Sequence, residues 1–193
     1  MIMASAKRDH LVTVALALFS KNGYRATGID TILAESAVAK MTLYNHFKSK
    51  DELIIAALNK RDADFLLWLR EAIKRHSKQQ QGDERIYKLM ALFDALNEWI
   101  NSDNFYGCNF INASIEFKRE DDPIHVAAAA HKKLMIQILL ELLVELNLEN
   151  ADYVAKQIHM IIEGAIVMAV SIGEKKSAVI AKQSTLQILQ PYL

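Results

Sequence analysis

The sequence is poor in residues that break or cross-link a chain, with two prolines, six glycines and one cysteine among 193 residues. A single cysteine cannot form an intrachain disulfide, which excludes a disulfide-stabilised secreted scaffold and favours a reducing cytoplasm. Because 52% of the residues are apolar and alternating β-branched runs are lacking, we expect an all-α fold.

Signals for secretion or membrane insertion are also lacking. Residues 1–4 lead at once into charged residues, without the apolar core of a signal peptide. The longest apolar run, residues 138–146, is interrupted by Glu141 and Glu145 and is too short to span a bilayer. We therefore expect a cytoplasmic protein with no membrane partner.

Patterns typical of catalysis or metal binding are lacking as well. His125 and His131 are six residues apart, about 240° around a helix, so they cannot share a metal on one face. The sequence has neither a glycine-rich phosphate loop nor a serine-centred elbow. We expect no enzyme activity, metal or cofactor. Cys108 is either a thiol sensor or, more commonly for a lone cysteine, a small buried hydrophobe.

Charge is unevenly distributed although the net charge is zero. Residues 1–61 hold nine basic and five acidic residues, and the remainder holds 14 basic and 18 acidic residues. A basic amino-terminal segment is what a phosphate backbone attracts, although so small an asymmetry also arises by chance.

Residues 27–47 have the pattern of two short helices joined by a tight turn. Thr27 is placed to cap the first helix by accepting from the N–H of Asp30. The second helix, from about Ala39 to Phe47, turns Leu43 and Phe47 inward. Its outward residues suit the major groove of DNA, because amides bond base edges and cations and hydroxyls bond phosphates. The alternative is a solvated surface helix of any α-helical protein.

The stretch FSKNGYRATGIDTILAESAVAKMTLYNHFKSKDEL resembles the DNA-binding module of TetR-family transcriptional regulators. The resemblance is carried by an ordered set: Phe19, Asn22-Gly23-Tyr24, Thr27, Lys40, Thr42-Leu43-Tyr44, His46-Phe47, Lys48-Ser49-Lys50 and Glu52-Leu53. It implies a double-stranded DNA operator as partner and these DNA-binding residues: Thr27, Lys40, Met41, Thr42, Tyr44, Asn45, His46 and Lys50.

Three positions depart from the family pattern. Ala37 stands where the turn commonly has glycine, which costs about 1 kcal/mol if the turn requires a positive φ. Ala39 replaces a serine that commonly caps the recognition helix, and Met41 replaces a small residue that faces the groove. These departures affect the operator sequence more than DNA binding itself.

The remaining chain predicts a larger helical body. A helix capped by Ser49 runs about 28 residues towards Gly82, and further helices follow from Asp83, Gly107, Pro123, Asn150 and Ala178. We expect a three-helix DNA-binding domain at residues 1–50, in which a helix from about Ser5 to Asn22 supports the helix-turn-helix. Residues 51–193 are expected to form the ligand-binding and dimerisation domain.

Aromatic and methionine side chains of this body are either ordinary core or the lining of an apolar effector pocket with a few polar groups. The candidate ligand-binding residues are Phe65, Trp68, Met90, Phe93, Cys108, Phe110, Ile111, Ser114 and Glu163. The last two helices carry more apolar surface than a monomer needs, which predicts a homodimer through them, unless they pack only within the chain.

The sequence thus predicts a TetR-like regulator, most simply a repressor that a small, largely apolar ligand releases from a palindromic operator. The alternative is a ligand-binding or protein-interaction module that has lost specific operator recognition.

Overall fold

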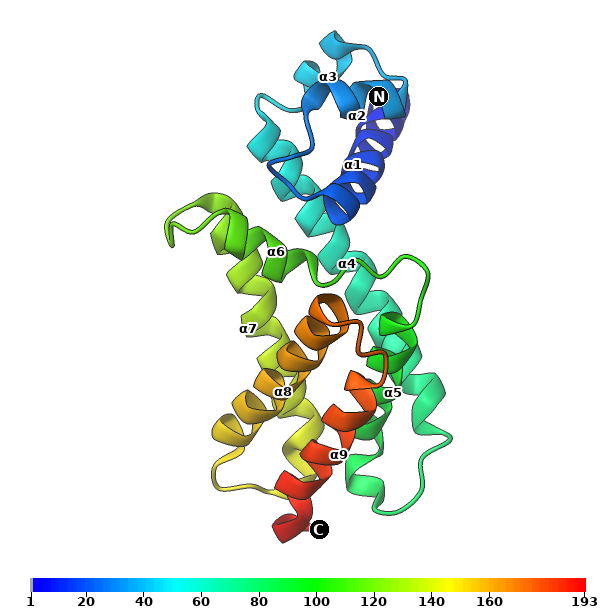
Figure 1. Cartoon of the computed structure of the whole chain (residues 1–193), viewed down its shortest axis with the longest axis vertical. Helices are drawn as coiled ribbons and strands as arrows, with labels where there is room; N and C mark the ends of the chain where they lie inside the picture. The colour runs from blue at the N-terminus through cyan, green and yellow to red at the C-terminus, as the bar shows by residue number, and fades with distance from the viewer. Residues whose placement is uncertain (1) are drawn as a thin grey trace. The chain divides into compact units, whose positions relative to one another are not determined.

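The computed structural model describes residues 2–193, with side-chain exposure from Ala6 onward. The described residues form helices and contain no strand, so the all-α prediction is confirmed (Figure 1). The α-helices are α1 (Ile2–Asn22), α2 (Ile29–Ser36), α3 (Lys40–His46), α4 (Lys50–Ser77), α5 (Tyr87–Ile100), α6 (Asn109–Glu116), α7 (Pro123–Leu143), α8 (Ala151–Ser171) and α9 (Ser177–Leu189). Short 3-10 helices lie at Glu84–Ile86, Val144–Leu146 and Gln190–Tyr192.

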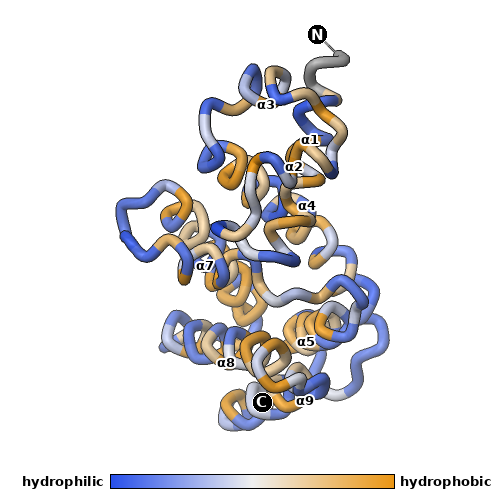
Figure 2. The backbone as a smooth tube through the Cα atoms, turned by 45° about the horizontal axis from the view of Figure 1, so that its top comes forward, coloured by the Kyte–Doolittle hydropathy of each residue, from blue (hydrophilic) through white to orange (hydrophobic). Residues whose placement is uncertain are grey.

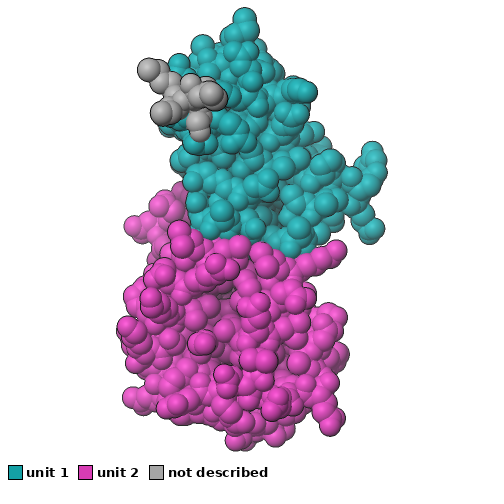
Figure 3. Space-filling model, turned by 180° about the vertical axis from the view of Figure 1, so that it is seen from behind, with its two compact units in different colours: residues 1–64, 108–131 teal, residues 65–107, 132–193 magenta. Residues whose placement is uncertain are grey.

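The chain divides into two compact units, which Figure 3 colours separately. Unit 1 comprises residues 1–64 and 108–131, and unit 2 comprises residues 65–107 and 132–193. The helix-turn-helix therefore shares its unit with the first half of α4, with α6 and with the start of α7. The functional boundary that we predict after residue 50 remains a prediction.

Unit 1 is built around the buried side of α1. Leu11 and Phe19 are at most 1% exposed, and they share the core with Ile32 of α2 and Leu43 of α3, which are fully buried. Both α2 and α3 pack against α1. Because a core so small fixes few side chains, the unit also uses polar contacts to hold its turns.

Several predicted helix ends are confirmed. The Ser49 hydroxyl accepts from the N–H of Glu52 at 3.2 Å, and the Glu52 carboxylate accepts from the N–H of Lys48 at 2.8 Å, which caps α4. Asp122 accepts from the N–H of Ile124 at 2.9 Å, and α7 begins with Pro123 as predicted.

Other predicted ends are wrong. The residue that caps α2 is Gly28, without a side-chain bond, and the Thr27 hydroxyl donates to the Gly23 carbonyl at 2.7 Å. Asn150 is the N-cap residue of α8, as predicted, but its side chain makes no capping bond. The helix α4 ends at Ser77, five residues before Gly82, the predicted stop.

Unit 2 packs α9 against both α5 and α8. The largely hydrophobic α5, visible in Figure 2, buries eight of its 14 residues. Among the described residues, α8 is the one helix long and apolar enough to cross a bilayer, and 44% of its most apolar window is buried inside the protein. Its buried residues recur every three to four positions from Val154 to Ala169, so one side of α8 packs into the protein.

Candidate nucleic-acid interface

The helix α3 has a buried and an exposed side, as its sequence predicts. Leu43 is fully buried and Phe47, just after the helix, is 3% exposed. On the other side Met41 is 75% exposed and Tyr44 is 46% exposed, and Asn45 is also exposed. Residues three and four positions apart lie on one side of a helix. The exposed side therefore offers a thioether, a phenol and an amide together.

The remaining candidates on and beside α3 differ in accessibility. Lys40 is exposed, and its ammonium lies 3.7 Å from the Asp30 carboxylate, which is itself 90% exposed. Thr42 and His46 are half-buried. A surface pair at that distance contributes little, so Lys40 remains available to a phosphate.

Lys50 lies at the start of α4 and is half-buried. Its ammonium donates to the carbonyl of Arg25 at 3.2 Å, and burial lowers its pKa. An ammonium has three donors, so this bond leaves two of them for another acceptor.

Thr27 does not belong to the exposed face. Its side chain is 2% exposed, and its hydroxyl donates to the Gly23 carbonyl. This hydrogen bond stabilises the turn between α1 and α2.

The turn between α2 and α3 contains two of the departures from the family pattern. Ala37 has φ 52° and ψ 27°, so the turn does require the left-handed conformation that favours glycine. Ala39 is the residue before α3 and, lacking a hydroxyl, makes no capping bond. The recognition helix thus forms without the two local aids that the family pattern usually supplies.

The candidate effector residues fall in both units. Phe65, Trp68, Met90, Phe93 and Glu163 belong to unit 2, and Cys108, Phe110, Ile111 and Ser114 belong to unit 1.

In unit 2 the aromatic candidates Phe65 and Trp68 belong to a ring cluster, in which Phe65 is tilted to Trp68 and edge-to-face with Trp99. The Phe65 ring centroid lies 5.6 Å from that of Trp68 and 5.8 Å from that of Trp99. Met90 and Phe93 are 4% and 1% exposed, as ordinary core residues are. Glu163 is half-buried, and its carboxylate pairs with the Lys132 ammonium at 2.7 Å. His159, one turn before Glu163, is 9% exposed, and its Nδ1 has no hydrogen-bond partner.

In unit 1 the candidates lie on or beside α6. The Phe110 ring stacks on the His131 imidazole with centroids 3.6 Å apart, and His131 Nδ1 lies 2.6 Å from the Asp62 carboxylate. The Ser114 hydroxyl donates to its own helix at the Ile111 carbonyl. Cys108, which precedes α6, is 7% exposed.

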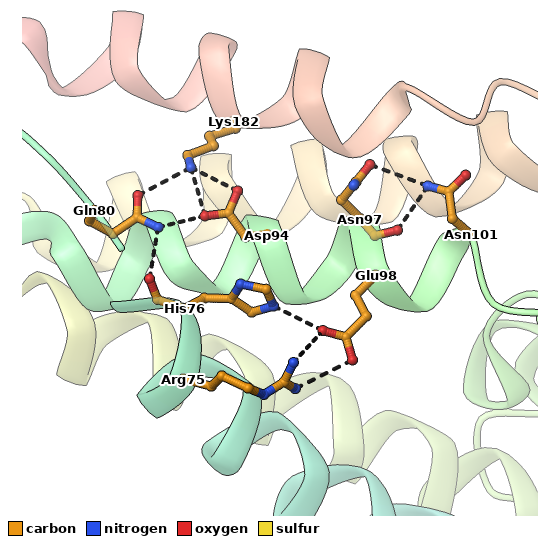
Figure 4. Close-up of polar contacts among 8 residues, drawn as sticks. All are labelled: Arg75, His76, Gln80, Asp94, Asn97, Glu98, Asn101 and Lys182. Carbon is orange, nitrogen blue, oxygen red and sulfur yellow. Dashed lines mark hydrogen bonds and ion pairs between the residues drawn. The ribbon is translucent and has the colours of Figure 1, made fainter. Parts of the chain in front are cut away.

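A polar network of unit 2 was not predicted (Figure 4). Lys182 of α9 donates to both carboxylate oxygens of Asp94 on α5 at 2.8 Å and to the Gln80 side chain at 3.2 Å. Glu98 accepts from Arg75 and lies 2.9 Å from His76 Nε2, and the Arg75 and His76 bonds lower the pKa of Glu98. The open groove beside the network has a volume of about 620 Å³ and only polar lining residues. The glutamine-rich segment after α4 was the one hint of it in the sequence.

Sequence reasoning also missed the role of Glu116. Its carboxylate accepts from the backbone N–H groups of Tyr24 and Arg25 at 3.0 and 2.7 Å. The partners are more than ninety positions apart along the chain, so no local pattern signals the contact. Among the described residues, no group of three or more histidine, cysteine or acidic side chains is placed to hold a metal.

A helix-turn-helix with an exposed polar side, followed by a helical body, defines the class of DNA-binding transcriptional regulators. Residues 11–57 match the family model described as "Bacterial regulatory proteins, tetR family". The HTH-type transcriptional regulator YjdC of Escherichia coli is 24% identical over 160 residues, covering 83% of this chain and 81% of YjdC. The HTH-type transcriptional regulator QacR of Staphylococcus aureus is 33% identical over 113 residues, covering 58% of this chain and 54% of QacR.

The structure of a TetR-family transcriptional regulator from Streptomyces coelicolor matches with a TM-score of 0.83 and 26% identity, covering 96% of this chain and 89% of that one. Residues 11–57 thus carry a DNA-binding module of the TetR family, and the whole chain has the fold of a TetR-family transcriptional regulator. Proteins of this family bind DNA operators and small-molecule effectors and are dimers.

Proposed function

We propose that this protein is a cytoplasmic homodimeric repressor without enzyme activity, which binds a palindromic operator in its free form and releases it when a small, largely apolar ligand binds the helical body. The observation that carries the proposal is the exposed side of α3, where Met41, Tyr44 and Asn45 project together while Leu43 anchors the helix from behind.

Each exposed group of α3 has a partner in a major groove. The Asn45 amide suits an adenine edge, and the Met41 thioether suits a thymine methyl group. The Tyr44 hydroxyl and the Lys40 ammonium suit phosphates, which set the position of the helix along the duplex. We expect Thr42, His46 and Lys50 to add contacts from the rim, where their partial burial limits their reach.

The second half of the proposal is a dimer through α8 and α9. Exposed apolar side chains gather on these helices, with these exposed fractions: Met160 72%, Val167 46%, Met168 41%, Ile172 72%, Val179 43% and Ile180 47%. Because α8 and α9 pack on each other, their exposed sides give each subunit two helices to offer a second copy in a four-helix bundle. Such pairing supplies the two recognition helices that a palindrome needs.

Release by an effector requires only a difference in affinity between two conformers. A ligand that favours the conformer with wrongly spaced recognition helices by about 3 kcal/mol lowers operator affinity more than a hundredfold. The candidate pocket residues of unit 2 are Phe65, Trp68, Met90, Phe93 and Glu163. We propose that the Phe65, Trp68 and Trp99 cluster supplies apolar contact and that Glu163 supplies a polar one.

The sign of regulation follows from the simplest mechanism, in which a bound dimer excludes other proteins from the promoter. Relatives of both signs exist, because IcaR of Staphylococcus epidermidis is named a negative regulator and FasR of Mycolicibacterium smegmatis an activator. Transcription in vitro from the bound promoter, with and without the protein, decides the sign.

The direct test of DNA binding is a gel shift with the DNA upstream of the gene and with selected random DNA. We expect salt-sensitive, sequence-selective binding that Tyr44→Ala weakens at least tenfold at unchanged dimer mass and melting temperature. Tyr106→Ala is the matched control, because Tyr106 is 40% exposed but lies outside the helix-turn-helix. Wild-type protein that selects no sequence would favour the alternative, a binding module that has lost operator recognition.

A further inference from the structure

In the last turn of α6, the Glu116 carboxylate binds the turn between α1 and α2. Glu116 Oε1 accepts from the N–H of Tyr24 at 3.0 Å, and Oε2 accepts from the N–H of Arg25 at 2.7 Å. Both oxygens are thus used on two successive amides, as an anion uses the free N–H groups of a turn. Hydrogen bonds to an ionised acceptor are about twice as strong as neutral ones.

Further contacts join the same two segments. The Arg25 Nε donates to the Glu116 carbonyl at 3.0 Å, and its guanidinium lies over the Phe117 ring, 5.1 Å from the centroid. At the other end of α6 the buried Tyr24 hydroxyl donates to the Asn109 carbonyl at 3.1 Å. The turn is therefore held at both ends of α6.

Gly23 allows this approach. It has φ +87°, a conformation that side chains rarely adopt, and a Cβ there would lie 3.1 Å from Glu116 Oε1. Because Gly23 has no side chain, the Glu116 carboxylate can lie this close to the turn after α1.

The turn that Glu116 binds leads directly into the helix-turn-helix. Residues 23–28 connect α1 to α2, and Thr27 braces this segment through its bond to the Gly23 carbonyl. A shift of Tyr24 and Arg25 therefore moves the start of α2, and α3 follows after one short turn. The helix α6 is eight residues long, about 12 Å.

We propose that Glu116 is the positioning residue through which α6 sets the orientation of the recognition helix. Phe110, Ile111 and Ser114 of the same helix are candidate effector residues, so a ligand that displaces α6 also pulls the carboxylate from the turn. This inference rests on the proposed function, because it describes how the body controls the DNA-binding face. While Glu116 accepts from the N–H groups of Tyr24 and Arg25, the turn is held in the form that binds the operator.

The test is Glu116→Gln in the full chain, which keeps the size of the side chain but turns one acceptor into a donor facing an N–H group. We expect operator affinity to fall on the order of tenfold and hydrogen exchange at residues 23–28 to accelerate. Affinity for non-specific DNA and dimer mass should stay unchanged, because the phosphate-binding cations remain. Glu120→Gln is the matched control, since Glu120 is an exposed glutamate of the following loop.

The outcomes separate this inference from the proposed function. If the wild type selects an operator and Glu116→Gln binds it within twofold of the wild type, the inference is overturned and the function stands. If specific and non-specific binding fall together with the melting temperature, Glu116 only supports the fold and the inference is again overturned. A second variant, Arg25→Ala, removes the Nε bond but keeps both amide bonds, so we expect it to weaken operator binding less than Glu116→Gln does.

Discussion

The exposed side of α3 and the exposed side of α8 each present a methionine that is about three quarters uncovered, Met41 at 75% and Met160 at 72%. Their neighbours differ. Around Met41 lie a phenol, an amide and an ammonium, whereas Met160 shares its side of α8 with Val167 and Met168. An exposed apolar residue by itself therefore identifies neither surface, and the groups beside it decide which partner fits.

The difference follows from the solvent that each surface must displace. A DNA groove is hydrated and lined with donors and acceptors, so polar groups in reach of them regain the hydrogen bonds that they lose. A second protein copy offers mostly apolar surface at the centre of its interface, and burying aliphatic side chains there needs no such replacement.

The largest expected effect comes from placing a charge on each surface in turn. We expect Met160→Asp to break the dimer and to lower operator affinity more than a hundredfold, because a carboxylate in an apolar interface is left unpaired. Met41→Asp should lower operator affinity by repelling phosphates while dimer mass, measured by analytical ultracentrifugation, stays unchanged. A monomeric Met41→Asp or a fully dimeric Met160→Asp would reverse the assignment of the two surfaces.

A smaller effect is expected where α9 is tied to α5. Lys182→Met keeps the apolar stem but removes the ammonium from Asp94 and Gln80 (Figure 4). Since the pair is about a quarter to a third exposed, we expect the free energy of unfolding to fall by about 1–2 kcal/mol. Dimer affinity should fall with it, because α9 carries Val179 and Ile180, while α3 is unaffected.

The control for Lys182 is Lys156→Met. Lys156 pairs with Asp152 on the same helix, and both side chains are more than half exposed. Removing such a surface pair should cost less than about 0.5 kcal/mol in urea unfolding. An equal loss from both variants would show that the Asp94 network contributes nothing beyond a surface pair.

Acid should lower the free energy of unfolding through His159, which lies on the buried side of α8. Burial lowers the pKa of His159 below its ordinary value of 6.5, and Lys132 adds to this while Glu163 opposes it. Because the folded pKa is the lower one, the unfolded state binds more protons, and stability present above pH 6.5 is lost as pH falls towards the folded pKa.

The measurement is the free energy of unfolding of wild type and His159→Leu between pH 7.5 and 5.5. We expect the wild type to lose more stability over this range than the variant. His125→Gln serves as control, because the His125 Nδ1 lies 2.8 Å from the Phe117 carbonyl, a partner that His159 Nδ1 lacks. Parallel curves for wild type and His159→Leu would contradict the assignment.

Helical periodicity predicted the side-chain orientations and the cap that depend on residues of a single helix. The inward Leu43 and Phe47, the exposed Met41 and Asn45, and the capped start of α4 follow from residues within one or two turns of each other. The contacts of Glu116 and Lys182 join residues 91 and 88 positions apart, and no spacing rule reaches that far. Thr27 shows the same limit, because the hydroxyl that the local pattern places to accept from α2 instead donates to the Gly23 carbonyl, where tertiary packing sets the turn.

The smallest expected effect concerns the turn before α3, where Ala37 occupies the left-handed region at φ 52°. Ala37→Gly should raise the free energy of unfolding by about 0.5–1 kcal/mol, because the gain from relieving the side-chain strain exceeds the added freedom of the unfolded chain. The check is thermal unfolding, in which this gain corresponds to a few degrees.

Asn147 provides the matched control, since it has φ 48° at the end of the 3-10 helix before α8. Asparagine tolerates this conformation better than alanine, so Asn147→Gly should change stability by less than Ala37→Gly does. Operator affinity of Ala37→Gly should stay within twofold of wild type, because the turn already has the conformation that glycine favours. A lower melting temperature for Ala37→Gly would mean that chain entropy outweighs the strain, and that the alanine stabilises the turn on which α3 is presented.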